Sequence, residues 1–190
     1  SLLEDRHPAN MVLLRGFSKH PDYPSMRDIY RLSPACIATY PMYRGVARVV
    51  GMDILPAGDT LEDQLAALQA DYDNHDFFFL HYKKTDARGE DGDFEAKVES
   101  IEAFDAFVPS VLEPGFDVVI VTGDHSTPAV LAMHSWHPIP VLLRGRYCRP
   151  DLVNEFAESA CLSGGLGHIH ATELMPLAMA NALKLNKYGA

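Results

Sequence analysis

Short apolar runs alternate with longer amphipathic segments along most of the chain. Each apolar run is followed by polar, proline or glycine residues, and the runs predict β-strands at 11–14, 35–39, 77–80, 118–121 and 141–143. Apolar residues at helical spacing predict helices at 42–50, 61–72, 93–112 and 172–183. The alternation predicts an α/β fold, with a mostly parallel sheet and helices on both faces.

Two of these elements carry more specific expectations. The run 118–121 holds four β-branched residues in succession, which predicts a buried strand of the kind found in parallel sheets. The helix at 93–112 is expected to begin after the N-cap residue Asp93. We expect the inner face of that helix to consist of Ile101, Phe104, Val108 and Val111.

Composition and charge fit one α/β domain. With 190 residues, 47% of them hydrophobic, the chain 1–190 can form a single domain with one sizeable core. A net charge of -10 argues against nucleic acid or an acidic membrane as a partner. The three cysteines have no metal-type spacing, so we expect reduced thiols in a cytoplasmic protein. No apolar run approaches the ~20 residues of a membrane span, and no secretory signal is visible.

The segment 122–128, with the sequence TGDHSTP, follows the apolar run 118–121 directly. It delivers Asp124 and His125 side by side at the carboxyl end of a strand, where open α/β sheets place their ligands. A hard oxygen ligand beside an imidazole nitrogen suits zinc, manganese or a similar divalent ion. The alternative is an N-cap aspartate next to a surface histidine. The neighbouring hydroxyls of Ser126 and Thr127 are expected to be helix N-cap groups.

Two further clusters of candidate ligands flank this segment. The strand at 77–80 opens into an acidic loop in which Asp86 and Glu90 stand four residues apart, so one helical turn would aim both carboxylates at one point. Downstream, His134 and His137 precede the strand at 141–143. Alternatives remain open: the acids that follow Glu90 fit a loop and a helix cap, and His137 before a proline fits a turn.

Taken together, these segments resemble a known family. The series HYKKTD at 81–86, GEDGDFEAKV at 89–98 and TGDHSTP at 122–128 resembles the archaeal-type, cofactor-independent phosphoglycerate mutases of the alkaline phosphatase superfamily. The similarity runs from about Asn10 to the end of the chain. It implies a partial alkaline phosphatase-like core and two divalent metal ions, Mn, Zn or Mg.

The resemblance also implies a set of metal ligands. Asp124 and His125 correspond to ligands of one metal, and Asp86 and His134 to ligands of the other. Glu90 occupies the remaining ligand position of that second metal, where many relatives have a histidine. A carboxylate there makes the site harder and more anionic, which favours Mn or Mg relative to Zn.

The nucleophile of the family has no counterpart in these residues. Members of the family use a serine and an early aspartate from their amino-terminal half, and we find no candidate for either here. The resemblance therefore implies the carboxyl-terminal part of a longer protein, with no catalytic residue in this segment and with the missing amino-terminal half as its partner. The isolated segment is expected to be inactive.

Substrate binding is expected to involve cationic side chains, since phosphoglycerate carries a phosphate and a carboxylate. Arg15 matches a family position that reaches the substrate, and Arg44 and Arg48 share one predicted helix face. The segment 1–55 is therefore expected to contact the substrate and return into the core. Lys83 is a similar candidate, although surface salt bridges would also explain these cations.

The family resemblance implies the interconversion of 2-phosphoglycerate and 3-phosphoglycerate through a phosphoserine. Two alternatives stay open. One is another member of the superfamily, a phosphomonoesterase or a phosphopentomutase, which would keep the metal ligands. The other is a non-catalytic metal-binding subunit.

Overall fold

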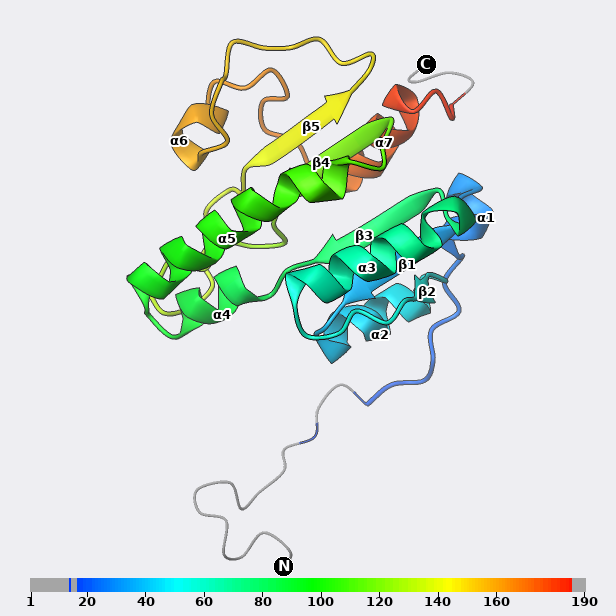
Figure 1. Ribbon diagram of the computed structural model, residues 1–190, viewed down its shortest axis with the longest axis horizontal. Coiled ribbons are helices and arrows are strands. Elements are labelled where there is room, and N and C mark those ends of the chain that lie inside the picture. The colour runs from blue at the N-terminus through cyan, green and yellow to red at the C-terminus, as the bar shows by residue number, and fades with distance from the viewer. Residues whose placement is uncertain (1–13, 15–16, 186–190) are drawn as a thin grey trace, which may run out of the picture.

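The computed structural model describes residue 14 and residues 17–185 (Figure 1). Its helices are α1 (Met26–Tyr30), α2 (Pro41–Val49), α3 (Leu61–Asp71), α4 (Lys84–Glu90), α5 (Phe94–Leu112), α6 (Glu158–Cys161) and α7 (Leu174–Asn181). Its strands are β1 (Pro34–Ala38), β2 (Asp53–Ile54), β3 (Phe77–His81), β4 (Val118–Thr122) and β5 (Val141–Gly145). Two short 3-10 turns, η1 (Tyr72–Asn74) and η2 (Ala171–Glu173), complete the described elements.

The strands form two separate sheets. β1 lies at the centre of a parallel sheet with the order β2-β1-β3. β4 and β5 pair antiparallel, with Ile120 opposite Leu143. The run 118–121 therefore forms a strand as predicted, but its partner is antiparallel rather than parallel. The reason is the connection 123–140, which contains no helix, whereas two parallel strands need a crossover between them.

Helices cover both faces of the parallel sheet, as the alternation of elements predicts. On one face Ile37 packs in a cluster with Leu68 of α3, and on the other face Cys36 packs with Ala47 of α2. All five residues of β1 are buried, because this strand has a neighbour on each side and a helix on each face. β1 is therefore the centre of the core.

The long helix α5 begins as predicted but faces the core differently. The Asp93 side chain accepts a hydrogen bond from the backbone N–H of Ala96, so the predicted N-cap is confirmed. The prediction that Ile101 lies on the inner face is wrong, because its side chain is 49% exposed. α5 packs on α4, and its buried residues are Ser100 and Phe107.

Two predicted elements lie near the ends of the chain. The predicted strand 11–14 lies outside the described residues except for Leu14, which has no regular secondary structure. At the other end α7 confirms the predicted helix and begins after the turn η2. No helix in the part of the chain that the structure describes is long and apolar enough to cross a membrane.

Candidate metal centre

The candidate ligands lie beyond the carboxyl ends of β3 and β4. Asp86 and Glu90 lie on α4, which begins three residues after β3 and confirms the predicted helical turn between them. Asp124 and His125 follow β4 directly. His134 comes from the long β4–β5 connection, which is fixed here because the backbone N–H of Ser135 donates to Ser126 at 2.9 Å.

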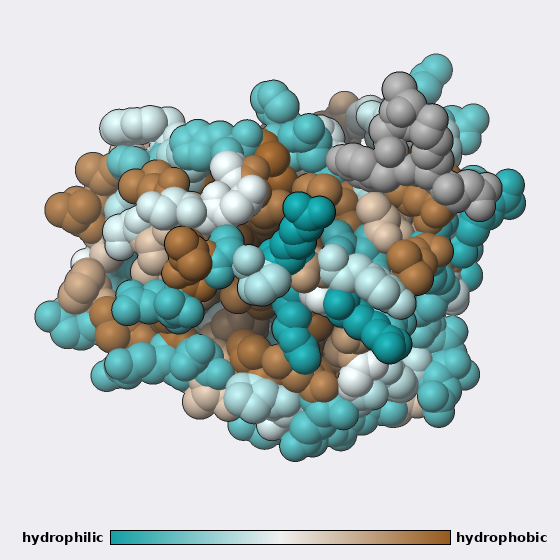
Figure 2. All heavy atoms as spheres, turned by 90° about the horizontal axis from the view of Figure 1, so that it is seen from above, coloured by the Kyte–Doolittle hydropathy of each residue, from teal (hydrophilic) through white to brown (hydrophobic). Residues whose placement is uncertain are grey.

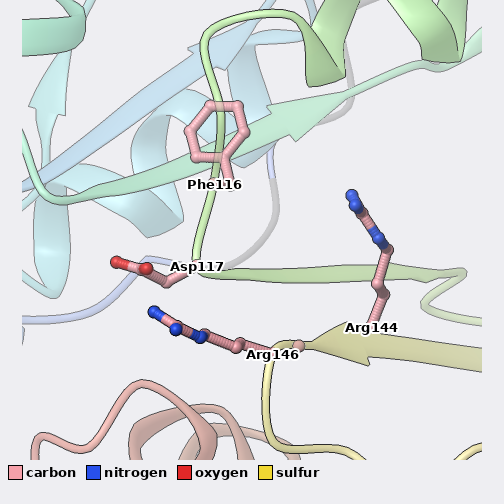
Figure 3. A pocket seen from close by; sticks show the side chains of 5 residues that line it. Phe116, Asp117, Arg144 and Arg146 are labelled. Atoms are coloured by element: carbon pink, nitrogen blue, oxygen red, sulfur yellow. The ribbon is translucent and has the colours of Figure 1, made fainter.

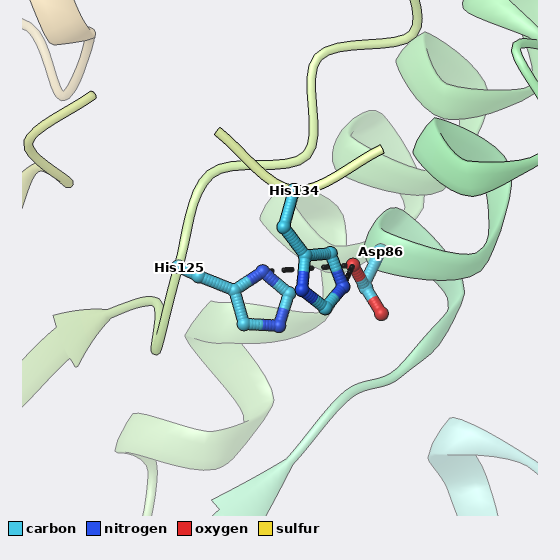
Figure 4. Close-up of side chains that lie close together, drawn as sticks. All are labelled: Asp86, His125 and His134. Atoms are coloured by element: carbon cyan, nitrogen blue, oxygen red, sulfur yellow. Dashed lines mark ion pairs between the residues drawn. The ribbon is translucent and has the colours of Figure 1, made fainter. Parts of the chain in front are cut away.

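Three of these side chains converge on one point, as Figure 4 shows. One ligand atom from each of Asp86, His125 and His134 lies within 4.8 Å of the other two. Oδ1 of Asp86 is 3.8 Å from Nδ1 of His125 and 3.7 Å from Nε2 of His134. The two imidazole rings stack with their centroids 3.8 Å apart. Two ligands of one zinc-like ion lie roughly 3.3–3.5 Å apart, so Asp86 and His134 need only a small shift to share an ion.

The other two candidate ligands lie at opposite sides of this cluster. Oε1 of Glu90 is 3.4 Å from Nε2 of His134, and Oδ2 of Asp124 is 3.5 Å from Nε2 of His125. Glu90 therefore lies beside His134 and Asp124 beside His125, on either side of the cluster of three. Oxygen and imidazole donors of this kind fit the chemistry of a divalent ion.

Thr127 connects Asp86 and His125, a role that the sequence did not predict. Its hydroxyl donates to Oδ1 of Asp86 at 2.5 Å and lies 3.0 Å from Nδ1 of His125. Because that hydroxyl has one proton, it accepts from the N–H at Nδ1, which leaves the lone pair of His125 on Nε2, the atom facing Asp124. The N-cap expectation for Ser126 and Thr127 is wrong, because no helix begins there. The adjacency of Thr127 to the Asp-His pair is the only sequence signal for this role.

Tyr43 of α2 is a second contact that the sequence reasoning missed. Its hydroxyl donates to Oδ2 of Asp124, and its ring stacks on His81 with a centroid distance of 3.7 Å. Burial and this hydrogen bond raise the pKa of Tyr43, so the phenol stays protonated. Burial lowers the pKa of His81, and its Nδ1 has no hydrogen-bond partner among the described residues. Tyr43 therefore holds Asp124 in place from the α2 side.

Lys83 faces the carboxylates of the centre. Its ammonium donates to Oδ2 of Asp86 and lies 3.7 Å from Oε2 of Glu90. Burial alone would raise the pKa of Asp86, but hydrogen bonds from Lys83 and Thr127 and the Lys83 charge outweigh it and hold that pKa below its usual value. The pKa of Asp124 is likewise low, since the Tyr43 hydrogen bond outweighs its burial. Both carboxylates are ionised at neutral pH, the state that metal binding requires.

The predicted arginines occupy different places. Arg44 and Arg48 lie exposed on α2, and Arg44 follows the Tyr43 that contacts Asp124. Arg15 lies outside the described residues. Helix α2 therefore lies beside the centre. Tyr43 makes its contact with Asp124, and Arg44 and Arg48 make none with the candidate ligands.

Close packing of α4 fixes the Asp86 side of the centre. Gly89 is buried in this helix, and a Cβ atom there would collide with the carbonyl oxygen of Thr127 and approach Nζ of Lys97 to 2.9 Å. The same Lys97 ammonium donates to the Thr127 carbonyl. The glycine therefore allows α4 to approach the segment that carries His125.

Comparison with known proteins identifies the superfamily of the chain. The sequence profile of the metalloenzyme superfamily matches residues 6–181. The chain belongs to the metalloenzyme superfamily. Its curated relatives in this superfamily include a "probable 2,3-bisphosphoglycerate-independent phosphoglycerate mutase" from Thermus thermophilus, 52% identical over 192 residues, and one of the same name from Thermotoga maritima, 48% identical over 189 residues. The resemblance stated from the sequence motifs is confirmed.

This metalloenzyme superfamily chain spans about half the length of the curated relatives it matches. All of it aligns with 47% of the Thermus thermophilus protein. A solved structure from Pyrococcus horikoshii matches 96% of the chain, but only 51% of its own, with 31% identity and a TM-score of 0.86. A cofactor-independent phosphoglycerate mutase from Thermoplasma acidophilum shares the fold at 23% identity, with a TM-score of 0.67, over 84% of this chain and 39% of its own. The predicted fold class is confirmed.

Proposed function

We propose that the chain is the metal-binding part of a phosphoglycerate mutase, which interconverts 2-phosphoglycerate and 3-phosphoglycerate. The observation that carries the proposal is the meeting of acid and imidazole groups from two different sheets, Asp86 from beyond β3 and His125 and His134 from beyond β4. Acidic side chains alone are common on surfaces. Two imidazoles that face a carboxylate held by Thr127 form a set of donors selective for divalent ions.

In this proposal the ligands divide between two ions. Asp124 and His125 hold one, and Asp86, Glu90 and His134 hold the other. Divalent ions bound side by side would neutralise the oxygens of a transferring phosphoryl group and lower the pKa of an attacking hydroxyl. The glutamate at position 90 favours Mn or Mg over Zn.

The remaining residues of the centre position these donors. Thr127 fixes the tautomer of His125 and orients the carboxylate of Asp86, and Tyr43 orients Asp124. Lys83 compensates the charge of Asp86 and Glu90, and turns toward the substrate anion when a metal takes that role. Arg44 and Arg48 on α2, and Arg15, supply further cationic groups for the phosphate and carboxylate of the substrate. The serine that carries the phosphoryl group belongs to the half of the relatives' length outside the match.

Metal content after dialysis against Mn, Zn or Mg tests the ligand assignment. We expect two ions per wild-type chain, and a lower metal content in Asp124→Ala and in His134→Ala, each of which removes a ligand of one ion. The matched controls are Asp105→Ala and His168→Ala, which remove an exposed aspartate and an exposed histidine outside the centre. A metal content that stays at the wild-type level in the two ligand variants, or falls equally in the controls, would contradict the proposal.

The substrate requires the longer protein. A chain joined to the missing half is expected to convert 3-phosphoglycerate to 2-phosphoglycerate, with little action on phosphopentoses or simple phosphomonoesters. The opposite preference would favour another member of the superfamily. Metal binding without any phosphoryl transfer would favour the non-catalytic subunit.

A further inference from the structure

Lys97 is a partly buried cation beside the metal centre. It lies on α5, and its ammonium donates to the backbone carbonyl of Thr127. Charged side chains usually stay at the surface, and hydrophilic residues are spread over the face seen in Figure 2. Withdrawing an ammonium from water is costly unless it makes a specific contact, so the contact of Lys97 indicates a specific role.

Other cations of the described chain have different surroundings. Lys83 and Lys184 each pair with an aspartate. Arg144 and Arg146 are exposed and line a cavity of about 350 Å³ at the amino end of β4, the end away from the metal ligands (Figure 3). Among the described residues, Lys97 forms no ion pair, and its partner is a neutral carbonyl. Lys97 therefore acts as a hydrogen-bond donor and not as half of a salt bridge.

The carbonyl that accepts this hydrogen bond belongs to a buried, irregular segment. Thr127 is only 4% exposed, so water has little access to its backbone. The connection 123–140 forms no helix, and the next residue, Pro128, has no backbone N–H. A buried carbonyl needs a hydrogen-bond partner, and secondary structure does not provide one here. Lys97 supplies it from the neighbouring helix.

Three contacts fix this segment at the metal centre. The Ser126 carbonyl accepts from the backbone N–H of Ser135 at 2.9 Å, which sets the path of the chain. The Thr127 hydroxyl donates to Asp86, and the Thr127 carbonyl accepts from Lys97. The last two bonds hold the side chain and the backbone of the same residue. Lys97 thus fixes the backbone from which the Thr127 hydroxyl projects.

Helix α4 confines the ammonium to this position. A Cβ atom on Gly89 would lie 2.9 Å from Nζ of Lys97, so the ammonium packs directly against the α4 backbone. Gly89 belongs to the last turn of α4, where the helix dipole favours a cation. The ammonium of Lys97 therefore lies where α4, α5 and the segment that carries His125 meet.

We propose that Lys97 is a positioning residue of the metal centre. Its hydrogen bond holds the Thr127 backbone so that the Thr127 hydroxyl stays between Asp86 and His125. That hydroxyl accepts from Nδ1 of His125, which keeps the lone pair of His125 on Nε2. Lys97 acts through Thr127 and does not itself bind an ion. The effect on metal affinity rests on the proposed function, whereas the effect on the His125 tautomer does not.

The tautomer of His125 tests the proposal without metal. Proton–nitrogen correlation spectra of the histidine rings are recorded in the presence of a chelator at about pH 8, where an ordinary imidazole is neutral. We expect wild-type His125 to carry its proton on Nδ1. Lys97→Met keeps most of the length of the side chain and removes the donor. In this variant we expect the two ring nitrogens of His125 to move toward a common chemical shift, because the tautomers mix.

Two further variants separate the hydrogen bond from charge and from general stability. Lys97→Gln keeps an N–H donor without the charge and should retain the wild-type tautomer. Lys184→Met is the matched control, because it removes a lysine at the opposite end of β3, and it should also retain that tautomer. Circular dichroism checks the fold of each variant. A purely structural role for Lys97 would lower stability and leave the ring nitrogens of the folded protein unchanged.

Titration with Mn measures the consequence for the metal centre. The affinity of Lys97→Met should fall about tenfold, at the lower end of the range for groups that orient ligands. Lys97→Gln and Lys184→Met should bind Mn about as tightly as wild type. This difference between variants is measured on the same chain as the metal content, so both tests refer to the same protein.

Three results would overturn the proposal. They are an unchanged His125 tautomer in Lys97→Met, mixed tautomers in folded Lys97→Gln, and equal Mn affinities of the wild type and Lys97→Met. If Lys97→Met does not fold, the tautomer in Lys97→Gln decides. A wild-type chain that binds no Mn would count against the proposed function, whereas the tautomer measurements in chelator would still decide the role of Lys97.

Discussion

The central strand β1 and the edge strands β3 and β4 differ in how far their apolar residues are buried. β1 is built from small and medium residues, has a strand on each side and is buried throughout. β3 and β4 carry larger apolar residues, have one partner each and remain partly exposed. The difference shows that burial here follows the number of neighbouring strands more than the hydrophobicity of the strand itself.

The candidate metal ligands follow the less buried of these strands. Asp86 follows β3 and Asp124 follows β4, so their relative position depends on two sheets that share no hydrogen-bonded strand pair in the described residues. β1 is buried throughout, whereas Asp86 and Asp124 extend from strands that each have one described partner. Three experiments test this division.

The largest effect is expected from equal truncations in the two regions. Ile37→Ala in β1 should lower the free energy of unfolding by about 2–5 kcal/mol, because Ile37 is fully buried and its neighbours cannot collapse into the cavity. Ile120→Ala in β4 removes the same atoms from a half-buried site and should cost roughly half as much. Urea denaturation of the isolated chain measures both. Equal costs would show that β4 is as well buried as β1 and would remove the basis of the comparison.

A smaller effect is expected from Thr127→Val, which keeps the shape of the side chain and removes the hydroxyl between Asp86 and His125. Metal affinity should fall about 10- to 100-fold, as for other groups that orient ligands. Isothermal titration with Mn measures the change, and circular dichroism checks the fold. Ser126→Ala, which removes the adjacent hydroxyl, is the matched control and should bind normally. Unchanged affinity in Thr127→Val would mean that the ligands need no such support.

The smallest effect concerns Asp76, just before β3. Its carboxylate accepts from the Ser33 N–H at 2.6 Å and pairs with Lys184 at 2.8 Å. Burial opposes ionisation, but these contacts outweigh it and lower the pKa of Asp76. The carboxylate therefore stabilises the fold above about pH 4, and this contribution is lost as the pH falls through the lowered pKa.

Asp76→Asn should accordingly cost less than about 1 kcal/mol at pH 7, since the Asp76 side chain is 41% exposed and water screens the pair. The difference from wild type should shrink below about pH 4. Unfolding curves at several pH values measure it, with Asp105→Asn on the exposed side of α5 as control. A difference that stays constant with pH would assign the effect to packing instead of charge.

Much of the fold follows from local patterns. The runs at 35–39 and 77–80 form strands, and Asp93 caps α5, because strand propensity and capping depend on a few neighbouring residues. The antiparallel pairing of β4 and the exposure of Ile101 were missed, because both depend on which other segments are present to pack against them. The hydrophobic pattern of one segment does not show which other segments pack against it.

The clustering of Asp86, His125 and His134 could be predicted because acids and imidazoles occur in short motifs after strands. Tyr43 and Thr127 were not found, because their roles arise from contacts with residues far away in the sequence, 81 positions from Tyr43 to Asp124 and 41 from Asp86 to Thr127. A tyrosine at the start of an amphipathic helix and a threonine before a proline have ordinary local explanations. Only the assembled fold distinguishes the orienting groups from their neighbours.

The buried glycine of α4 has an evolutionary consequence. Gly89 touches the backbone of Thr127 where no side chain fits, although its own backbone conformation is that of an ordinary helical residue. Any amino-acid substitution of Gly89 would push the helix that carries Asp86 away from the segment that carries His125. Purifying selection is then expected to retain glycine at position 89 in lineages that keep the metal, whereas lineages that lose the chemistry are free to drift there.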